Sequence, residues 1–300
     1  MCNVIKNDVR THDMISIVIP AHDEGLVIAR TLEALITGAL PGELDVVVVC
    51  NGCTDNTAAI ARGFGTPVRV IETARPNKSH ALNLGDLATR AFPRVYVDAD
   101  VVVTLSTIRA LAKRLHKGDV IAVAPRPHFD LTGCSWPVRA FYDIRCRLPS
   151  FNEGIGGSGV YALSEIARRR FGDFPNLVAD DTYVRVQCKR EERETLSSVN
   201  SIVFAPHTIK DLVAIEARAD FGTFELGRLY PELVANKGES NHKALVTLFK
   251  HPLLWPRLFI YWYVRVTARR KAKIRLQTKS FVWERDETSR RARSANIPKP

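Results

Sequence analysis

The sequence lacks any long apolar run. None of its stretches reaches roughly 18 uninterrupted apolar residues, whereas a membrane-spanning helix needs about 20. Its first residues, MCNVIKNDVRTHDM, also lack the apolar core of roughly 7–15 residues found in secretory signals. We therefore expect neither a conventional spanning helix nor a secretory signal.

Cysteine is scarce and irregularly placed, with six residues in a chain of 300. Such usage fits a reducing compartment better than a disulfide framework, so we expect a cytoplasmic protein. Internal repeats and low-complexity segments are also missing from the sequence. A chain of this length and composition predicts one large globular domain, or one domain with an appendage.

Charge is unevenly distributed along the chain, which carries a formal net charge of +11. Residues 265–300 contain twelve Lys and Arg residues against three Asp and Glu residues, so the rest is close to balanced. A concentrated basic segment is typical of contact with a polyanionic surface, either a membrane or a nucleic acid. A solvated helix with a frayed end explains the same pattern equally well.

An aromatic-rich stretch, HPLLWPRLFIYWYVRV (251–266), comes directly before the basic cluster. Aromatic residues beside Lys and Arg fit a segment that lies in a lipid interface and is attracted by anionic headgroups. We expect peripheral association with an anionic membrane, at the inner face of the plasma membrane. The alternative is a helix packed on the rest of the protein. No nucleic-acid partner is expected, because no recognised binding module accompanies the charge.

The first 125 residues alternate between two patterns. Continuous apolar runs occur at 15–20, 44–50, 68–73, 94–100 and 119–125, and helical patterns occur between them at 25–38, 54–64, 79–92 and 106–117. Strands that are apolar throughout are buried on both faces, as in a parallel sheet covered by helices. The alternation predicts an α/β fold, with helices beginning at Thr54 or Asp55, Ser79 and Ser106.

The remaining residues follow a looser pattern. A glycine cluster at 154–159 precedes a helical pattern at 163–171 and a weak strand at 201–206, and the chain from 213 onward is helical and basic. We predict one domain over 1–212, divided into a regular α/β part (14–125) and a looser part (126–212). Residues 213–300 form the predicted helical extension.

Polar residues follow three of the predicted strands, at 20–24, 50–55 and 98–100. In a parallel sheet these carboxyl ends meet in one crevice, where ligands bind. Asp98 and Asp100 lie two residues apart, so their side chains point to the same side of an extended chain. They are suited to hold Mg²⁺ or Mn²⁺ together with substrate phosphates. Alternatively, one aspartate caps the next helix and the other is solvated.

An ordered series of motifs resembles family 2 glycosyltransferases of the GT-A fold. The series comprises IVIPAHDE (17–24), VVVVCNGCTDNT (46–57), RPNKSHALNLG (75–85), VDAD (97–100), and the pair GIGGSG (154–159) and FPNLVADDTYV (174–184). The resemblance covers roughly residues 14–212. It implies that 1–212 is the catalytic domain, with a nucleotide-sugar part (14–125) and an acceptor and base part (126–212). It implies a mixed, mostly parallel sheet flanked by helices, and an inverting, metal-dependent transfer from a nucleotide-diphospho-sugar, with a UDP-sugar favoured.

The resemblance also implies roles for matching positions. Asp181 would be the catalytic base beside Asp180, and Asp100 the direct ligand of Mn²⁺ or Mg²⁺, with Asp98 touching the metal or the ribose. The remaining substrate-binding set is Pro20, His22, Glu24, Asn51, Asp55, Lys78, Asn83, Gly156, Gly157, Ser158 and Arg218. His207 is a further candidate metal ligand, although a lone histidine is more often structural. Asp23, Asn51, Cys50, Asn77 and Asp180 depart from the family pattern.

The residue types fit this chemistry. A metal stabilises the charge that develops on a leaving diphosphate, and a carboxylate can take the proton of an acceptor hydroxyl. The adjacent carboxylates of Asp180 and Asp181 repel each other, which favours a raised pKa for one of them. Alternatively, both cap a helix over 182–190. The glycines 156, 157 and 159 allow close backbone approach to a sugar or diphosphate, or form a plain loop.

The expected acceptor is a glycan, a glycolipid or a small molecule, with a lipid-linked or cell-envelope glycan favoured. Other functions compete with this interpretation. A catalytically silent relative that binds sugar or membrane has the same motifs. A nucleotidyltransferase is disfavoured because the Gly-rich phosphate loop near the N-terminus is missing. CNGC (50–53) is a C-x-x-C between a strand and a helix, as in disulfide oxidoreductases, but the other motifs have no role in such a protein.

Overall fold

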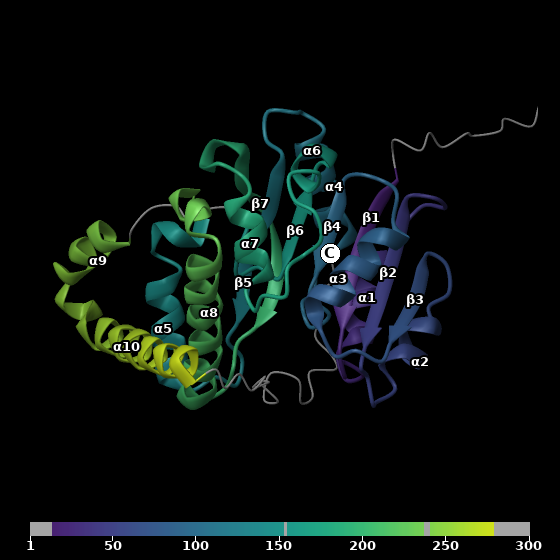
Figure 1. Cartoon of the computed structure of the whole chain (residues 1–300). Helices are drawn as coiled ribbons and strands as arrows, with labels where there is room; N and C mark the ends of the chain where they lie inside the picture. Colours follow the sequence, from purple (N-terminus) through teal and green to yellow (C-terminus); the bar gives the residue numbers. More distant parts are fainter. Residues whose placement is uncertain (1–13, 153–154, 237–240, 279–300) are drawn as a thin grey trace, which may run out of the picture.

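The computed structural model describes residues 14–152, 155–236 and 241–278. Seven strands form one sheet in the order β3-β2-β1-β4-β6-β5-β7 (Figure 1). The strands are β1 (Ile15–Ala21), β2 (Leu44–Asn51), β3 (Val68–Thr73), β4 (Arg94–Val97), β5 (Ala122–Asp130), β6 (Val160–Leu163) and β7 (Arg193–Phe204). β1 pairs in parallel with β2 and β4, β2 with β3, and β5 with β7, whereas β6 is antiparallel to both β4 and β5. The α/β architecture and the mixed, mostly parallel sheet are as predicted.

Helices cover both faces of the sheet. Alternate residues of β1 point to opposite faces, so Ile17 and Ile19 pack with α1 (Ile28–Ile36), α2 (Thr57–Arg62) and α4 (Leu105–Leu115). Val18 faces the other side, which α3 (Lys78–Ala88), α6 (Glu165–Arg168) and α7 (Asp180–Val186) cover. Every residue of β1 is buried, which explains why the strand is apolar almost throughout.

The helix starts differ slightly from those predicted. The N-caps are Asn56, Asn77 and Thr104, each one to two residues from the predicted capping residue. The side chains of Asn77 and Thr104 accept backbone N–H groups of the first turn. At α2 the N-cap is Asn56, but its side chain makes no capping hydrogen bond. The carboxylate of the predicted Asp55 accepts the backbone N–H of Thr57 in the first turn.

The second half of the sheet contains elements that the sequence pattern did not reveal. β6 has only four residues and follows the glycine cluster, and helix α5 (Trp136–Arg145) lies in the stretch where periodicity was weak. β7 begins at Arg193, eight residues before the predicted strand, and its register against β5 shifts between Pro125 and Arg126. The long β7 is mostly half-exposed, so its apolar signal is diluted over most of its length.

Helices predominate after β7. α8 (Ile209–Leu229) packs on α5, and α9 (His242–Phe249) leads into α10 (Trp255–Thr278), which runs along α8 and α5 (Figure 1). The face of α10 turned inward carries the buried Val264, Ala268 and Ala272. The interpretation of this segment as a helix packed on the protein is therefore correct, while several aromatic side chains of the same helix stay exposed. No helix in the described ranges has both the length and the apolarity needed to cross a membrane.

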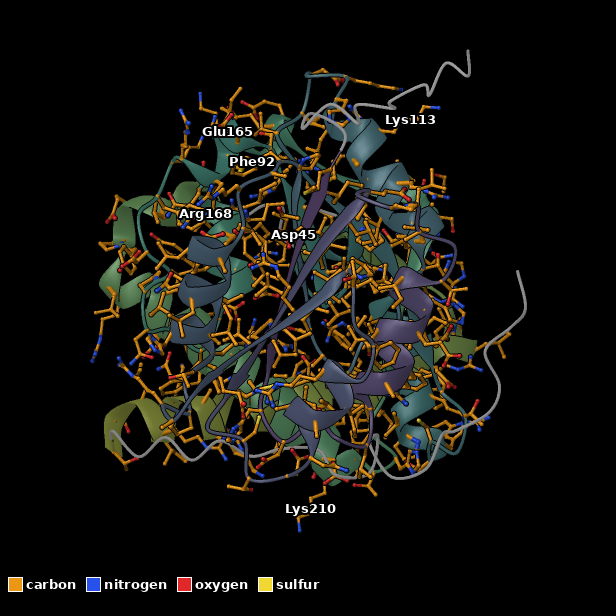
Figure 2. All side chains as sticks on the ribbon, turned by 90° about the vertical axis from the view of Figure 1, so that its right-hand side faces the viewer. Asp45, Phe92, Lys113, Glu165, Arg168 and Lys210 are labelled. Carbon is orange, nitrogen blue, oxygen red and sulfur yellow. The ribbon has the colours of Figure 1, made fainter. Side chains whose placement is uncertain are left out.

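The two ends of the sheet are easily told apart in Figure 2. Phe92, Lys113 and Glu165 lie at the end where the parallel strands begin, and Lys210 lies at the opposite end, just beyond β7. The polar stretches that follow β1, β2 and β4 therefore lie at the Lys210 end of the sheet.

Candidate functional site

A narrow cavity lies where β1 and β4 end, beside the glycine loop that precedes β6. Eight of the predicted site residues line it, namely Pro20, Lys78, Asp98, Gly156, Gly157, Ser158, Asp180 and Asp181. Asp98 comes directly after β4, Lys78 begins α3, and the two adjacent aspartates begin α7. Segments separated by about a hundred residues of sequence thus meet at the carboxyl end of the sheet, as expected for an α/β ligand site.

Lys78 is the centre of this cluster. Its Nζ lies 2.8 Å from Asp98 Oδ1 and 3.0 Å from Asp180 Oδ1. Burial acts to lower the pKa of Lys78, but the carboxylates of Asp180 and Asp98 outweigh it and raise that pKa above its usual value. Lys78 therefore stays charged. Its ammonium group joins Asp98, in the loop after β4, to Asp180, in the first turn of α7.

A set of amide contacts fixes the position of Lys78. The side chain of Asn77 caps α3 by accepting the His80 N–H, and it donates to Asn176 Oδ1 at 2.6 Å. One turn later, Asn83 accepts the Phe174 N–H at 2.7 Å and donates to the Phe174 carbonyl at 3.1 Å. The start of α3 is thereby held against the segment that leads into Asp180. Asn83 thus holds these two segments together, and its predicted place near the nucleotide stays a prediction.

The two adjacent aspartates have different surroundings. Asp180 is buried, with 7 % of its side chain exposed, and burial raises its pKa to about 6 against the opposing charge of Lys78. Asp181 is half-buried and accepts N–H groups from Thr182 at 2.6 Å and from Gly157 at 3.4 Å. Both residues lie in the first turn of α7, but neither caps it, because the N-cap is Ala179 and no side chain makes a capping hydrogen bond. The raised pKa falls on Asp180, the residue that pairs with Lys78.

The glycine loop has the backbone conformation that its sequence suggests. Gly156, Gly157 and Gly159 all have positive φ values, which glycine adopts without strain. A Cβ on Gly159 would lie 2.4 Å from Val101 Cγ2 and 3.3 Å from Asp98 Oδ2, so a side chain there would displace the loop after β4. Ser158, predicted to bind substrate, lines the cavity but is buried, and its hydroxyl donates to the Val160 carbonyl.

Asp98 and Asp100 point away from the core. Both are half-buried, whereas Ala99 between them is buried and its carbonyl accepts the hydroxyl of Thr31. The two carboxylates supply oxygen ligands of the kind that Mg²⁺ and Mn²⁺ prefer, and such sites usually draw their remaining ligands from substrate phosphates and water. Asp98, Asp100 and His207 do not form a three-ligand cluster in the described part of the chain. The His207 carbonyl accepts the Ser135 N–H just before α8.

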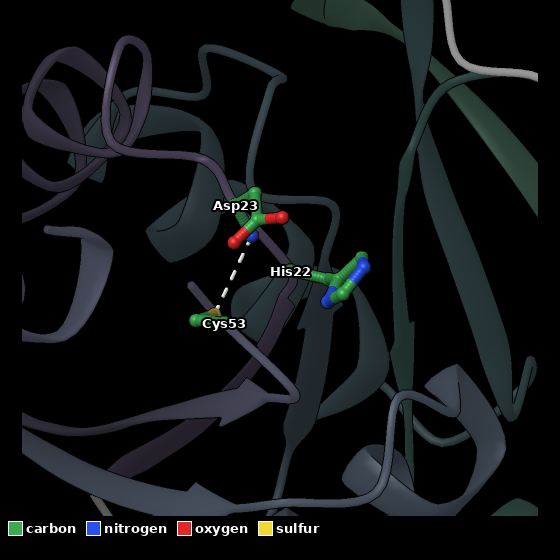
Figure 3. Close-up of side chains that lie close together, drawn as sticks. All are labelled: His22, Asp23 and Cys53. Atoms are coloured by element: carbon green, nitrogen blue, oxygen red, sulfur yellow. Dashed lines mark hydrogen bonds between the residues drawn. The ribbon is translucent and has the colours of Figure 1, made fainter. Parts of the chain in front are cut away.

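His22, Asp23 and Cys53 form a second polar group at the ends of β1 and β2, with ligand atoms within 4.8 Å of one another (Figure 3). The sequence did not single out this group. His22 Nδ1 lies 2.5 Å from the Asn51 carbonyl, and Asn51 donates to the Ala21 carbonyl. The Asp23 N–H lies 3.4 Å from Cys53 Sγ. These contacts set the positions of His22 and Asn51, which were predicted to face the nucleotide.

Hydrogen bonds also connect the loops that follow β1 and β2. Asp23 accepts the Thr54 N–H at 2.6 Å, and Asp55 accepts the Gly25 N–H at 2.9 Å. Burial opposes ionisation of Asp55, but hydrogen bonds from Thr57 and Gly25 lower its pKa overall. The buried Glu24 donates its backbone N–H to Thr57. Asp55, predicted to bind substrate, therefore has a clear structural role.

The cysteines of the C-x-x-C stretch lack the features of a redox pair. Burial raises the pKa of Cys50 to about 12 and also raises the pKa of Cys53, so both thiols are protonated at neutral pH. A disulfide oxidoreductase needs a thiolate nucleophile. The raised pKa values of the two thiols therefore argue against the redox alternative.

Arg218 and Tyr161 show two ways in which the cavity lining differs from the predicted set. Arg218, predicted near the diphosphate, lines neither this cavity nor the larger one described below. Tyr161 of β6, which the sequence did not indicate, does line it. Its hydroxyl is buried and has no hydrogen-bond partner among the residues that the structure describes. A strand prediction at 160–163 would have been needed to find it.

Comparison with known proteins agrees with this arrangement. The model of the family described as "Glycosyl transferase family 2" matches residues 16–165. The chain belongs to glycosyl transferase family 2. The match spans β1 to β6, and with it Lys78, both aspartates of the D-x-D and the glycine loop. It stops short of Asp180 and Asp181.

Individual relatives are similar to this chain either over a short segment or at low sequence identity. A 4,4'-diaponeurosporenoate glycosyltransferase of Staphylococcus aureus is 37% identical over 94 residues, which is 30% of this chain and 24% of that protein. A mannosyltransferase from Pyrobaculum calidifontis, solved with GDP-Man and Mn²⁺, aligns with a TM-score of 0.65 at 19% identity, covering 89% of this chain and 88% of the other. Glucosyl-3-phosphoglycerate synthase of Mycobacterium tuberculosis aligns with a TM-score of 0.50 at 18% identity, covering 72% and 79%. The structural alignments establish a shared GT-A fold.

Proposed function

We propose that this protein transfers a sugar from a nucleotide-diphospho-sugar to an acceptor hydroxyl, with inversion and with Mn²⁺ or Mg²⁺. The observation that carries the proposal is the cluster of Lys78 with Asp98, Asp180 and Asp181 at the carboxyl end of the sheet. The chain's family and the Mn²⁺ and GDP-Man in the mannosyltransferase of similar fold support it.

Each side chain has a distinct task in this proposal. Asp181 is open to the glycine loop and takes the proton of the acceptor hydroxyl. Asp180 holds Lys78, whose ammonium group faces the cavity where the diphosphate would lie. Asp100 and Asp98 would hold the metal, which when bound stabilises the negative charge of the leaving diphosphate. His22 and Asn51 would line the base and ribose part of the crevice.

The donor nucleotide can be identified by a thermal-shift screen of UDP-, GDP- and dTDP-sugars with Mn²⁺ or Mg²⁺. A ligand that binds only the native state raises stability by RT ln(1 + [L]/Kd), so the correct nucleotide gives the largest shift. UDP-sugars are our first choice, from the family resemblance. Absence of any metal-dependent shift with all three would contradict the proposal.

Two substitutions test the chemistry. Asp181→Asn is expected to retain donor binding and to lower the transfer rate by about 10²–10⁴, the usual contribution of a general base. Asp100→Ala, like EDTA, is expected to abolish metal-dependent transfer. The exposed Asp173→Asn serves as the control and should behave as wild type. If both site variants transfer at the wild-type rate, the proposed mechanism is wrong.

We also propose that the protein associates peripherally with an anionic membrane at the cytoplasmic face. The basic residues from Arg265 onward and the exposed aromatic residues of α10 support this. A lipid-linked or cell-envelope glycan acceptor is consistent with that location. The part of this basic segment beyond residue 278 lies outside the described residues.

A further inference from the structure

A second, much larger cavity lies between α5, α8, α9 and α10, with a volume of about 1120 Å³. We call it the helical groove. Its walls are largely aromatic: Phe129, Phe141 and Phe151 line one side, and Trp255, Phe259 and Trp262 of α10 line the other. The volume exceeds the roughly 300–1,000 Å³ of ordinary small-molecule sites, so a long ligand fits it better than a small one.

The helical groove adjoins the cavity of the candidate active site. Gly156 and Gly157 line both cavities, so the glycine loop is their shared wall. A Cβ on Gly156 would lie 4.0 Å from Asp181 Oδ2, and a Cβ on Gly157 would lie 3.5 Å from Arg145 Nη2 in the groove. An acceptor lying in the groove therefore has its end within reach of the proposed catalytic base.

Charged side chains on the floor of the groove pair with one another. Glu216 of α8 binds both Arg145 and Arg265, and Arg265 also contacts Asp220 at 2.7 Å. Burial opposes ionisation of Glu216, but the two arginines outweigh it and lower its pKa. These four charges compensate each other, and Arg269 adds one positive charge to the lining. Most of the remaining lining is apolar, so the aromatic walls dominate recognition.

Exposed apolar side chains gather beside the groove. Seven of the fourteen large apolar side chains exposed in the described part of the chain come from residues 246–263. Phe249, Trp255, Phe259 and Trp262 belong both to this set and to the groove lining. Soluble proteins seldom expose large contiguous apolar patches without a binding role, so the patch indicates an apolar partner.

We propose that the helical groove binds the acceptor, and that the acceptor is an amphiphile. Its apolar chain lies along the aromatic walls, and its hydroxyl reaches the glycine loop beside Asp181. This inference rests on the proposed function. In the transfer, the acceptor oxygen bonds to the anomeric carbon as the bond from that carbon to the phosphate oxygen breaks. The nucleoside diphosphate leaves with the electron pair, and the hydroxyl proton passes to Asp181.

The groove can be tested without a donor, using the full chain and the primary alcohols octanol, decanol and dodecanol. Binding is followed by the fluorescence of Trp255 and Trp262, which line the groove. Each buried methylene is worth about 0.8 kcal/mol, so affinity should rise about fourfold per added methylene. An affinity that does not depend on chain length would overturn the proposal.

A matched pair of variants locates the binding. Phe259 and Ile274 both lie on α10 and are similarly exposed, at 63% and 59%, but only Phe259 lines the groove. Phe259→Asp should weaken dodecanol binding at least tenfold, while Ile274→Asp should stay within twofold of wild type. Because both positions are exposed, neither variant should lose its fold. Equal effects of the two substitutions would exclude the groove as the binding site.

Vesicles of phosphatidylcholine and phosphatidylglycerol separate an acceptor groove from a membrane-docking surface. If Phe259→Asp loses vesicle binding but keeps dodecanol binding, the aromatic patch serves the membrane alone and the acceptor proposal fails. Metal-dependent donor binding by Phe259→Asp is measured in parallel and should equal wild type. A missing donor response in the wild-type protein would contradict the proposed function, whereas the alcohol series tests the groove independently.

Discussion

Tyr161 illustrates how a single atom can indicate ligand binding. Its side chain lines the cavity of the candidate site, and its buried hydroxyl has no hydrogen-bond partner in the described ranges. A buried polar group without a partner costs roughly 1–3 kcal/mol, so such a group is better explained by a ligand that completes it. Tyr96, which stacks on Tyr161, instead donates its hydroxyl to Asp86 at 2.6 Å.

These two tyrosines give a matched prediction. Tyr161→Phe should weaken donor binding by about 2- to 13-fold, the value of one hydrogen bond, without lowering the thermal stability of the free protein. Tyr96→Phe should lower stability by about 1 kcal/mol and leave donor affinity unchanged. Donor titrations and thermal melts of both variants test this. Loss of stability without loss of donor affinity in Tyr161→Phe would contradict it.

Asp180 predicts a dependence of stability on pH. Its pKa is raised to about 6 in the folded protein, above the usual value of 3.8, so ionisation disfavours the folded state relative to the unfolded one. The contribution of Asp180 to the free energy of unfolding is therefore greatest below about pH 4 and is lost as the pH rises through about 6. A pKa shift of this size corresponds to a change of about 2–3 kcal/mol in the free energy of unfolding.

Asp180→Asn removes this ionisation. The free energy of unfolding of the variant, relative to wild type, should increase as the pH rises from 4 to about 7 and then level off. Urea denaturation at several pH values measures the difference. A difference that stays constant over this range would mean that Asp180 is not the titrating group.

The positions of site residues were predictable where they belong to a motif, and less predictable where they depend on packing between distant segments. Asp98 follows from its place at a strand end, because the carboxyl ends of parallel strands converge. Lys78 and Asp181 lie in the first turns of helices, and they were predicted through the resemblance of their motifs to family 2 glycosyltransferases. The sequence cannot show that Asn83 binds Phe174 or that the Ser158 hydroxyl turns inward, since both depend on distant segments. Tyr161 was missed for the same reason, as β6 is too short to show strand periodicity.

At the scale of elements, α10 is held to α8 and α5 by a buried charge network. Glu216, with 6 % of its side chain exposed, pairs with Arg145 of α5 and with Arg265 of α10. Small residues of α10 let the helices approach closely around this network. Removal of one partner from a buried ion pair leaves the other charge uncompensated and is costly.

Glu216→Ala should therefore lower the free energy of unfolding by about 3–5 kcal/mol. Glu165→Ala is the control, because Glu165 pairs with Arg169 on the surface, where such a pair contributes about 0.3–0.5 kcal/mol. Chemical denaturation of both variants gives the comparison. Similar small losses in both would mean that the network does not hold α10 in place.

The elements themselves were predictable in proportion to their regularity. The first four strands and the helices between them appear in the sequence because β1, β2 and β4 are buried almost throughout. β3 is a half-exposed edge strand, and it appears through its β-branched residues. α5 and the early part of β7 do not, because half-exposed segments mix apolar and polar residues without a clear period. The antiparallel direction of β6 follows from the chain path and has no local signature.

At the scale of the whole molecule, the net charge of +11 predicts how membrane association depends on salt. Binding to vesicles that contain phosphatidylglycerol should weaken as NaCl increases from 0.05 to about 0.5 M, because screening shortens the Debye length below roughly 5 Å. Sedimentation with vesicles at several salt concentrations measures this. Neutral phosphatidylcholine vesicles are the control, and equal binding to both would leave no role for the basic residues.

The glycine loop between the two cavities has a consequence for how ligands in those cavities affect each other's binding. Because Gly156 and Gly157 form a wall of both, any ligand that moves the loop from one side alters the space on the other. Thermodynamic linkage then requires the effect to be reciprocal: the factor by which the first ligand changes the affinity of the second equals the factor in the opposite direction. Occupancy of the two cavities is thus a coupled equilibrium whenever the loop shifts.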